Sequence, residues 1–450
     1  MDDLLLESAP SSVFDIDLMA WVTQFGDNPF LAMGWLIAHG GWVVLLWAFL
    51  WGFRAMWLNW RQTLYKMSVK TMLLAIDVPK NTEQTVKAVE NMFAFLAGAH
   101  SSVSFLEKWW EGKTQDPITC EIVSIEGRTQ YIIHGPRKQR DLMEAAIYSQ
   151  YPDAEIQEVE DYTPQVPAHY PNDTHDAFTL EMTPVKNSVY PLKTYIDFEH
   201  QLTGEFKDPL AVLLEAFSRL GPGEQAWYQL VLTPIDQKEF VPLATKEIKK
   251  ITGQKEPPPK QTLLDKTLDA PLQAMQFAAT TVLGGGPAGP EHKKEENALN
   301  SRMWNLSPGE RKMVESLERK MSKIVFRCKI RFAYIGKKEL FNKYKVAYSL
   351  VGSFKQYNTN DAQALKPEAK HVGVSSSLVF FKTQRNNVRK SHLMHAYRKR
   401  SNWAGLPMFF LSTEEIASLW HLPVSLFVKA PQVKKTESKK SEPPINLPMG

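Results

Sequence analysis

The chain has 450 residues, enough for two or three domains, and 44% of them are hydrophobic, which excludes a wholly disordered protein. Its formal net charge of +4 is small for this length, so the overall balance does not indicate a nucleic-acid binder and any basic surface must be local. The two cysteines, Cys120 and Cys328, cannot supply a disulfide framework or a four-ligand zinc site, and a reducing compartment is the simplest interpretation.

An apolar segment close to the N-terminus predicts a membrane anchor. Seven of the thirteen tryptophans lie in the first sixty residues, and residues 30–53 contain no aspartate, glutamate, lysine or arginine. As a helix, these 24 residues would extend roughly 36 Å, enough to cross a bilayer. A cleaved signal peptide is the alternative, but the segment is long for one, starts late and follows acidic residues. We therefore expect a single transmembrane helix at 30–53.

The charges on either side of this segment predict its orientation. Residues 1–29 contain acidic residues but no lysine or arginine, whereas residues 54–70 contain four basic residues and no acid. Because lysine and arginine favour the cytoplasmic side, we expect the N-terminus outside and the bulk of the chain in the cytoplasm. Within the extracytoplasmic segment 1–29, residues 13–25 suit either an interfacial helix or a frayed terminus.

The elements after the anchor follow the order strand, helix, strand, strand, helix, strand. The predicted strands are 71–79, 118–125, 129–135 and 155–162. The apolar residues of the first helix recur at helical spacing, and Glu126-Gly127 marks a hairpin turn between the second and third strands. This order is that of the split βαβ motif, so we expect residues 62–162 to form a ferredoxin-like domain.

A proline-rich linker at 163–173 precedes a second α/β unit, expected at 174–425. Residues 251–306 interrupt its pattern with glycine, proline and charged residues, which predicts a mobile insertion whose helical stretch rests on the membrane or on a partner. Residues 426–450 read as a flexible tail. The expected class is therefore α+β: one transmembrane helix followed by two ferredoxin-like α/β units, the second split by a flexible insertion.

Two motifs suggest catalysis or metal binding but lack essential parts. The EGKT sequence at 111–114 resembles the end of a phosphate-binding loop, but Glu107 occupies the position that requires glycine. His392 and His395 are spaced like paired metal ligands, but no nearby cysteine or carboxylate completes a site. We expect no catalytic residue, cofactor or metal. A hydrolase site built from residues distant in sequence is the alternative.

The segment LSTEEIASLWHLP at 411–423 groups serine, glutamates, tryptophan and histidine. Ser412 precedes Glu415 by three positions, the spacing of a capping box at a helix start. His421 then falls in the last turn, where the helix dipole favours an imidazolium. We interpret this segment as the last helix of a domain rather than a catalytic cluster.

A basic segment at 382–400 is the candidate binding site. It contains no acid, so it can neutralise DNA phosphates or anionic lipid head groups, with Tyr397 as a candidate stacking group. A solvated helix face explains the pattern equally well, and neither interpretation implies base-specific recognition. The candidate contacts are Lys382, Arg385, Arg389, Lys390, Arg398, Lys399 and Arg400.

Several segments together resemble a known family. The apolar anchor is followed by TMLLAIDVPKN, DPLAVLLEAFSRLGPGEQAWYQLVLTP, LSTEEIASLWHLP and PPINLP. In this combination most of residues 30–450 resemble the membrane-anchored N-terminal region of bacterial proteins related to type IV secretion and conjugative DNA-transfer ATPases, a region of uncharacterised function. In many such proteins a motor domain with a phosphate loop follows, whereas this sequence ends at Gly450 without one. The resemblance implies that the motor is a separate polypeptide or that the protein works without it.

The sequence thus predicts a non-enzymatic protein of the bacterial inner membrane that docks or positions a secretion-type DNA-translocating ATPase at the cytoplasmic face. DNA, bound without sequence specificity, is a further candidate partner. An oligomer is compatible with this role. The alternative is a membrane-tethered module that binds nucleic acid or anionic lipid through the segment at 382–400.

Overall fold

The structure is a computed structural model that describes residues 42–77, 84–198, 208–253, 306–359, 361–368 and 380–423. The chain divides into two compact units: residues up to 69 together with 103–114, and residues 70–102 together with 115 onward. Predictions for the segment 1–29, for most of the insertion and for the tail lie outside the described residues. So do residues 30–41 of the expected transmembrane helix.

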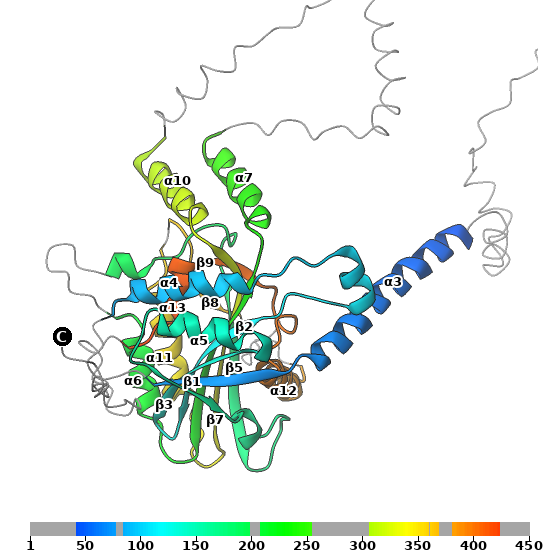
Figure 1. Ribbon diagram of the computed structural model, residues 1–450. Helices are drawn as coiled ribbons and strands as arrows, with labels where there is room; N and C mark the ends of the chain where they lie inside the picture. The colour runs from blue at the N-terminus through cyan, green and yellow to red at the C-terminus, as the bar shows by residue number, and fades with distance from the viewer. Residues whose placement is uncertain are drawn as a thin grey trace, which may run out of the picture. The chain divides into compact units, whose positions relative to one another are not determined.

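Within the described residues, the first unit contains a long helix and a short helical segment (Figure 1). The long helix is α3 (Trp42–Ser68), and the short one is η3 (Glu107–Glu111), a single π-helical turn. None of the helices in the described residues combines the length and apolar composition that a membrane span requires. The transmembrane helix at 30–53 therefore stays a prediction.

The second unit contains one large antiparallel sheet, which confirms the expected mixed α+β class. Its strand order is β4-β1-β3-β2-β6-β7-β5-β8, and β9 pairs with β7. The strands are β1 (Thr71–Asp77), β2 (Ile118–Ile125), β3 (Arg128–Pro136), β4 (Glu155–Val159), β5 (His175–Pro184), β6 (Glu224–Pro234), β7 (Val325–Lys337), β8 (Leu365–Pro367) and β9 (Phe409–Ser412).

The two halves of this sheet repeat one arrangement. The first half runs β1, α4, β2, β3, α5, β4 and has the strand order β4-β1-β3-β2; the second runs β5, α6, β6, β7, α11, β8 and has the order β8-β5-β7-β6. The halves join because β2 pairs with β6, with Ile118 opposite Leu232 and Ile125 opposite Gln225. The two α/β units expected from the sequence are therefore not separate bodies but halves of a single sheet.

Helices cover the sheet, and two of them lie on either side of the insertion in sequence. They are α4 (Val86–Leu96), α5 (Arg140–Tyr148), α6 (Ala211–Ser218), α7 (Val241–Ile251), α10 (Pro308–Met321), α11 (Lys343–Lys355), α12 (Lys382–Arg398) and α13 (Thr413–Leu419). Helices α7 and α10 flank the insertion and pack together through a small apolar cluster that includes Ala244 and Leu317. Figure 1 shows these two helices side by side at one end of the sheet.

The two faces of the sheet differ in character because side chains alternate along each strand. On β2, Cys120 and Ile122 point into the main apolar core, which α4, α5, α6, α11 and α13 complete. Thr119, Glu121 and Val123 point to the opposite face, where Val123 joins a second cluster with Met394 and Tyr397 of α12. Charged side chains on that face are also buried. Whether they could bind a ligand depends on whether they are already paired with one another.

Candidate functional site

The predicted basic segment at 382–400 occupies α12 and the turn after it. Lys382 and Lys399 are exposed, whereas Arg400 is only 4% exposed. Arg385, Arg389, Lys390 and Arg398 are half-buried. The seven candidate residues therefore do not share one solvent-facing surface.

Members of this segment are held by partners within the chain. Lys390 forms an ion pair with Asp176. Arg398 donates a hydrogen bond to the carbonyl oxygen of Thr163 at 2.9 Å, so the proline-rich stretch interpreted as a linker is part of the packed structure. Tyr397 is 1% exposed, which excludes it as a stacking platform for a base in this conformation.

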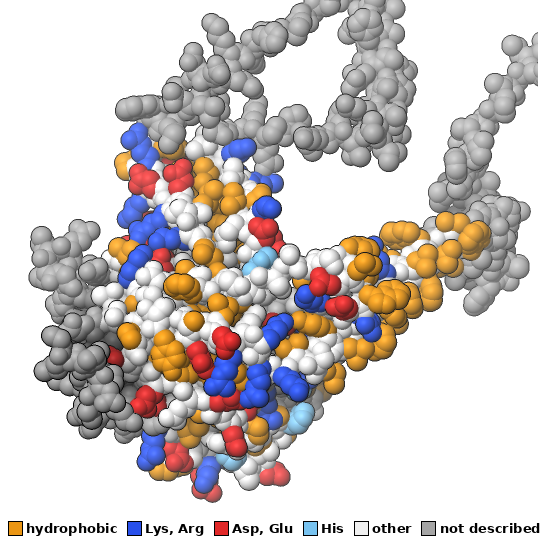
Figure 2. Space-filling view, viewed as in Figure 1, with side chains coloured by type: hydrophobic (Ala, Val, Ile, Leu, Met, Phe, Trp, Pro, Cys, Tyr) orange, Lys and Arg blue, Asp and Glu red, His pale blue; other side chains and the backbone are white. Residues whose placement is uncertain are grey.

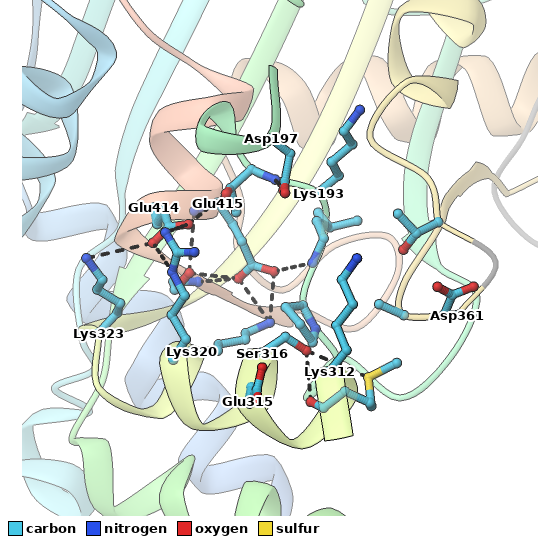
Figure 3. A pocket seen from close by; sticks show the side chains of 18 of the residues that line it. Lys193, Asp197, Lys312, Glu315, Ser316, Lys320, Lys323, Asp361, Glu414 and Glu415 are labelled. Atoms are coloured by element: carbon cyan, nitrogen blue, oxygen red, sulfur yellow. Dashed lines mark hydrogen bonds and ion pairs between the residues drawn. The ribbon is translucent and has the colours of Figure 1, made fainter. Parts of the chain in front are cut away.

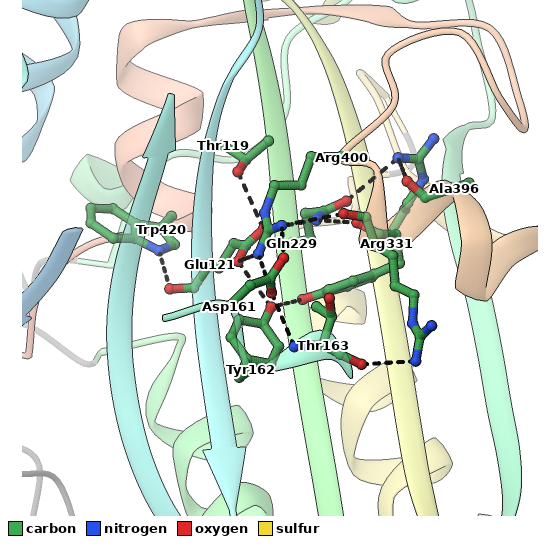
Figure 4. Close-up of polar contacts among 12 residues, drawn as sticks. Thr119, Glu121, Asp161, Tyr162, Thr163, Gln229, Arg331, Ala396, Arg400 and Trp420 are labelled. Atoms are coloured by element: carbon green, nitrogen blue, oxygen red, sulfur yellow. Dashed lines mark hydrogen bonds and ion pairs between the residues drawn. The ribbon is translucent and has the colours of Figure 1, made fainter. Parts of the chain in front are cut away.

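Arg400 belongs to a buried polar network centred on Glu121 (Figure 4). Its Nε lies 2.9 Å from Oε1 of Glu121, and its Nη1 lies 3.0 Å from Oδ2 of Asp161. Glu121 also accepts hydrogen bonds from the hydroxyl of Tyr162 at 2.9 Å and from Nε2 of Gln229 at 2.8 Å. Burial lowers the pKa of Arg400, but the charges of Glu121 and Asp161 raise it well above its ordinary value.

The network continues across four neighbouring strands. Register places Glu121 opposite Gln229, Gln229 opposite Arg331, and Arg331 opposite Glu181. Nε of Arg331 lies 2.6 Å from Oε1 of Glu181, and both side chains are almost wholly buried. Charges taken out of water are tolerated when each is paired and hydrogen-bonded. We therefore assign a structural role to these four residues, because both carboxylates already accept hydrogen bonds from buried side chains of the protein.

A cavity of about 490 Å³ lies between α10, the segment 191–197 and the start of α13. Its lining carries equal numbers of basic and acidic side chains. These are Lys193, Lys312, Arg319, Lys320 and Lys323, and Asp197, Glu315, Asp361, Glu414 and Glu415. The balance gives the cavity no net charge that would select an anion or a cation.

Five of the ten charges in this cavity are paired around α13 (Figure 3). Nζ of Lys320 lies 3.0 Å from Oε2 of Glu415, and Arg319 and Lys323 both pair with Glu414. Burial lowers the pKa of Lys320, and the charge of Glu415 opposes that effect. Among the described residues, no group of three or more histidine, cysteine, aspartate or glutamate side chains is placed to hold a metal ion.

The last helix has the structural role that its sequence indicates. The capping box is present, with the Ser412 hydroxyl accepting from the amide of Glu415 and the Glu415 carboxylate accepting from the amide of Ser412. His421 lies two residues beyond the end of α13 rather than in its last turn, because the backbone of Trp420 is extended. It is buried, and its Nε2 lies 3.0 Å from Oδ1 of Asp208. Asp208 in turn accepts from the amide of Leu210 ahead of α6. This histidine joins the ends of two helices.

The first unit carries the most unusual surface of the described residues. Along α3 the side chains of Trp47, Phe49 and Trp51 are 68%, 67% and 65% exposed, and Figure 2 shows apolar side chains gathered along this helix. Exposed apolar surface of this extent marks an interaction site. Sequence reasoning identified the apolar helix but missed the segment 103–114, which adds Phe105, Leu106 and Trp110 to the same unit. The adjacent tryptophans in LEKWW were the available signal.

Comparison with known proteins gives a family without a function. One family model matches residues 62–435, and its description is a domain of unknown function, DUF8128. The match begins within α3, after its most apolar part, and includes the segment 103–114. No curated protein matches the chain.

Proposed function

Because the chain belongs to the DUF8128 family, whose description names no activity, we propose a function from its surface: the protein is a non-enzymatic module anchored to a membrane through α3 and the apolar residues before it. The single observation that supports this proposal is the exposed apolar surface over Trp42–Phe53. Residues 30–41, outside the described part, continue the same charge-free sequence.

The exposed apolar side chains of α3 surround the helix rather than forming a stripe. From Trp42 to Phe53, the large apolar side chains that are at least 45% exposed are Trp42, Val43, Leu45, Leu46, Trp47, Phe49, Leu50, Trp51 and Phe53. Consecutive positions on a helix are about 100° apart, so these residues face every direction. A helix that is apolar all round needs an apolar environment on all sides, and lipid provides this more readily than the groove of one protein partner.

The α/β unit would then be held at the membrane surface as a docking platform. Each half of its sheet has the element order and strand order of a ferredoxin-like unit, and we interpret the sheet as two such units fused edge to edge. The proposed partner is a separate DNA-translocating ATPase of the secretion type at the bacterial inner membrane. This partner and this location rest on the sequence resemblance alone.

Liposome flotation of the purified full chain, after detergent removal in the presence of vesicles, tests the anchor. A Trp42→Arg, Leu46→Arg variant places two charges one turn apart in the apolar part, at a cost of about 2.5–3.5 kcal/mol each near the bilayer centre. We expect the native chain to float and this variant to float much less. The matched control, Asn59→Arg with Thr63→Arg, adds the same charges beyond Phe53 and should float like the native chain. Equal flotation of both variants would contradict the proposal.

The alternative function, binding of DNA or anionic lipid by the basic segment, needs a narrower test than the sequence suggests. Reversing the charge of buried Arg400 would disturb the fold and could not report on binding. Charge reversal of the exposed Lys382 and Lys399 is the informative change. Salt-dependent DNA binding that is lost in this double variant would support the alternative, and unchanged binding would remove it.

A further inference from the structure

A second apolar surface lies on the segment 103–114, which begins 35 residues after the end of α3 in sequence but belongs to the same compact unit. Phe105, Leu106 and Trp110 are 74%, 73% and 70% exposed. Three neighbouring large apolar side chains with this exposure need an apolar partner. The segment is otherwise short and polar, so its apolar groups serve contact rather than a core of its own.

Specific contacts hold this segment against the charged end of α3. Nε1 of Trp57 donates to the carbonyl oxygen of Trp109 at 3.0 Å, and the rings of Trp57 and Trp110 lie 6.2 Å apart. The guanidinium of Arg54 lies 4.9 Å from the ring centre of Trp109. Gly112 approaches the backbone of Arg61 so closely that an added Cβ would lie 2.2 Å from its carbonyl carbon. The position of the segment on α3 is therefore defined by packing.

We propose that these residues form an aromatic collar that lies in the head-group region of the bilayer leaflet at the end of the anchor. The aromatic collar consists of Trp57, Trp60, Phe105, Leu106, Trp109 and Trp110. This inference rests on the proposed membrane anchor and deepens it. It assigns a lipid-contacting role to a segment far from the apolar run in sequence.

The position of the collar along α3 matches the dimensions of a membrane interface. The charge-free sequence ends at Phe53, and Trp57 and Trp60 follow four and seven residues later, which is roughly 6–10 Å along a helix. The interfacial layer on each side of a bilayer is of similar thickness, about 5–8 Å. Tryptophan is enriched in that layer, and basic residues follow it on the cytoplasmic side. Arg61, Lys66 and Lys70, which follow Trp60 in the sequence, fit this pattern.

The charges of the segment are compatible with this location. Glu107 pairs with Lys113 at 2.6 Å, and the hydrogen bond from Lys113 lowers the pKa of Glu107 to about 2. The ion pair brings no net charge to the interface. A bilayer also accounts for both apolar surfaces of this unit at once, because lipid that surrounds α3 continues directly to the collar.

Site-directed fluorescence tests the collar separately from the anchor. Cys120 and Cys328 are buried, so an environment-sensitive dye can be attached selectively at Phe105→Cys or Leu106→Cys in the full chain. The control is Lys238→Cys, whose native side chain is 90% exposed in the α/β unit. Each labelled protein is reconstituted into phosphatidylcholine and phosphatidylglycerol vesicles, with and without lipids that carry a nitroxide quencher close to the head group.

We expect blue-shifted emission and strong quenching at positions 105 and 106, and water-like emission without quenching at 238. If the labelled proteins float with the vesicles but positions 105 and 106 behave like 238, the collar is wrong and the anchor stands. Blue-shifted emission without quenching by lipid would indicate a protein contact and would also overturn the collar. Failure of every variant and of the unlabelled chain to float would overturn the proposed function itself.

Discussion

Glu121 on β2 and Arg400 after α12 form a buried ion pair at 2.9 Å although 279 positions separate them in sequence. The pair connects the first half of the sheet to the segment that covers the polar face of both halves. Removing one member of such a pair leaves a buried charge without compensation. The stability of the α/β unit should therefore depend strongly on Arg400.

We expect Arg400→Met to lower the free energy of unfolding by about 3–5 kcal/mol, since Glu121 and Asp161 both lose a charged partner. Lys399→Met removes the neighbouring exposed charge and should change it by no more than about 0.5 kcal/mol. Urea unfolding followed by near-ultraviolet circular dichroism measures both values. Similar unfolding curves for the two variants would show that the buried network around Glu121 contributes little to the free energy of unfolding.

The buried pair of Lys320 and Glu415 should behave in the same way on the other side of the sheet. Lys320 also donates to the carbonyl oxygens of Ser188 and Phe410, each at 3.0 Å. Lys320→Met is expected to cost about 3–5 kcal/mol. Lys312→Met, an exposed lysine of the same helix and cavity, is the control and should be nearly neutral. Thermal unfolding of the two variants distinguishes these outcomes.

The free energy of unfolding should decrease at acid pH because several carboxylates have pKa values below their ordinary values. Burial raises the pKa of Glu224, but hydrogen bonds from Lys345, Tyr334 and Gly221 lower it more, so that it lies below its ordinary value of 4.5. A carboxylate with a depressed pKa stabilises the folded state above the pKa of the unfolded chain, and this contribution disappears as pH falls through the folded value. The same direction holds for Glu90, Asp161 and Asp208.

The native chain should therefore have a lower urea midpoint at pH 3 than at pH 6. Glu224→Gln should be less stable than the native chain at pH 6, and the difference in stability should shrink as the pH falls below the ordinary carboxyl pKa, because the contribution of a depressed pKa declines there. If the difference in stability between the native chain and Glu224→Gln does not change with pH, Glu224 stabilises the fold through its packing rather than its charge.

Gly112 should be essential for holding the segment 103–114 on α3. Its φ of +72° lies in the left-handed region, and a Cβ would meet the backbone of Arg61. Gly112→Ala should thus cost about 1–2 kcal/mol from the backbone conformation in addition to the clash. Hydrogen exchange at 103–114 should accelerate. Gly52→Ala, at a helical position with nothing within 4 Å of the added Cβ, should leave that exchange unchanged.

Sequence reasoning succeeded where the determinants are local. The capping box predicted at Ser412 is present, because a serine and a glutamate three positions later suffice to form one. The order of strands and helices in the first half could likewise be read from apolar spacing and turn residues. These features require no knowledge of distant partners.

Pairing across long distances could not be read from the sequence. Nothing in β2 or β6 indicates that these strands pair edge to edge, because any unpaired strand edge offers the same backbone groups. Arg400 looked like one more cation of a basic segment since its charge is visible in sequence but Glu121 as its partner is not. The prolines of residues 163–173 indicated a linker, yet Val166 and Tyr170 are buried against α12.

The central claim is that the apolar surface of α3, together with the residues before it, lies in lipid. The most direct measurement is sodium carbonate extraction of membranes from bacteria that express the full chain with a C-terminal tag. We predict that the chain stays in the membrane pellet after extraction and is released only by detergent. Recovery of the intact chain in the carbonate supernatant, or in the soluble fraction before extraction, would contradict the account.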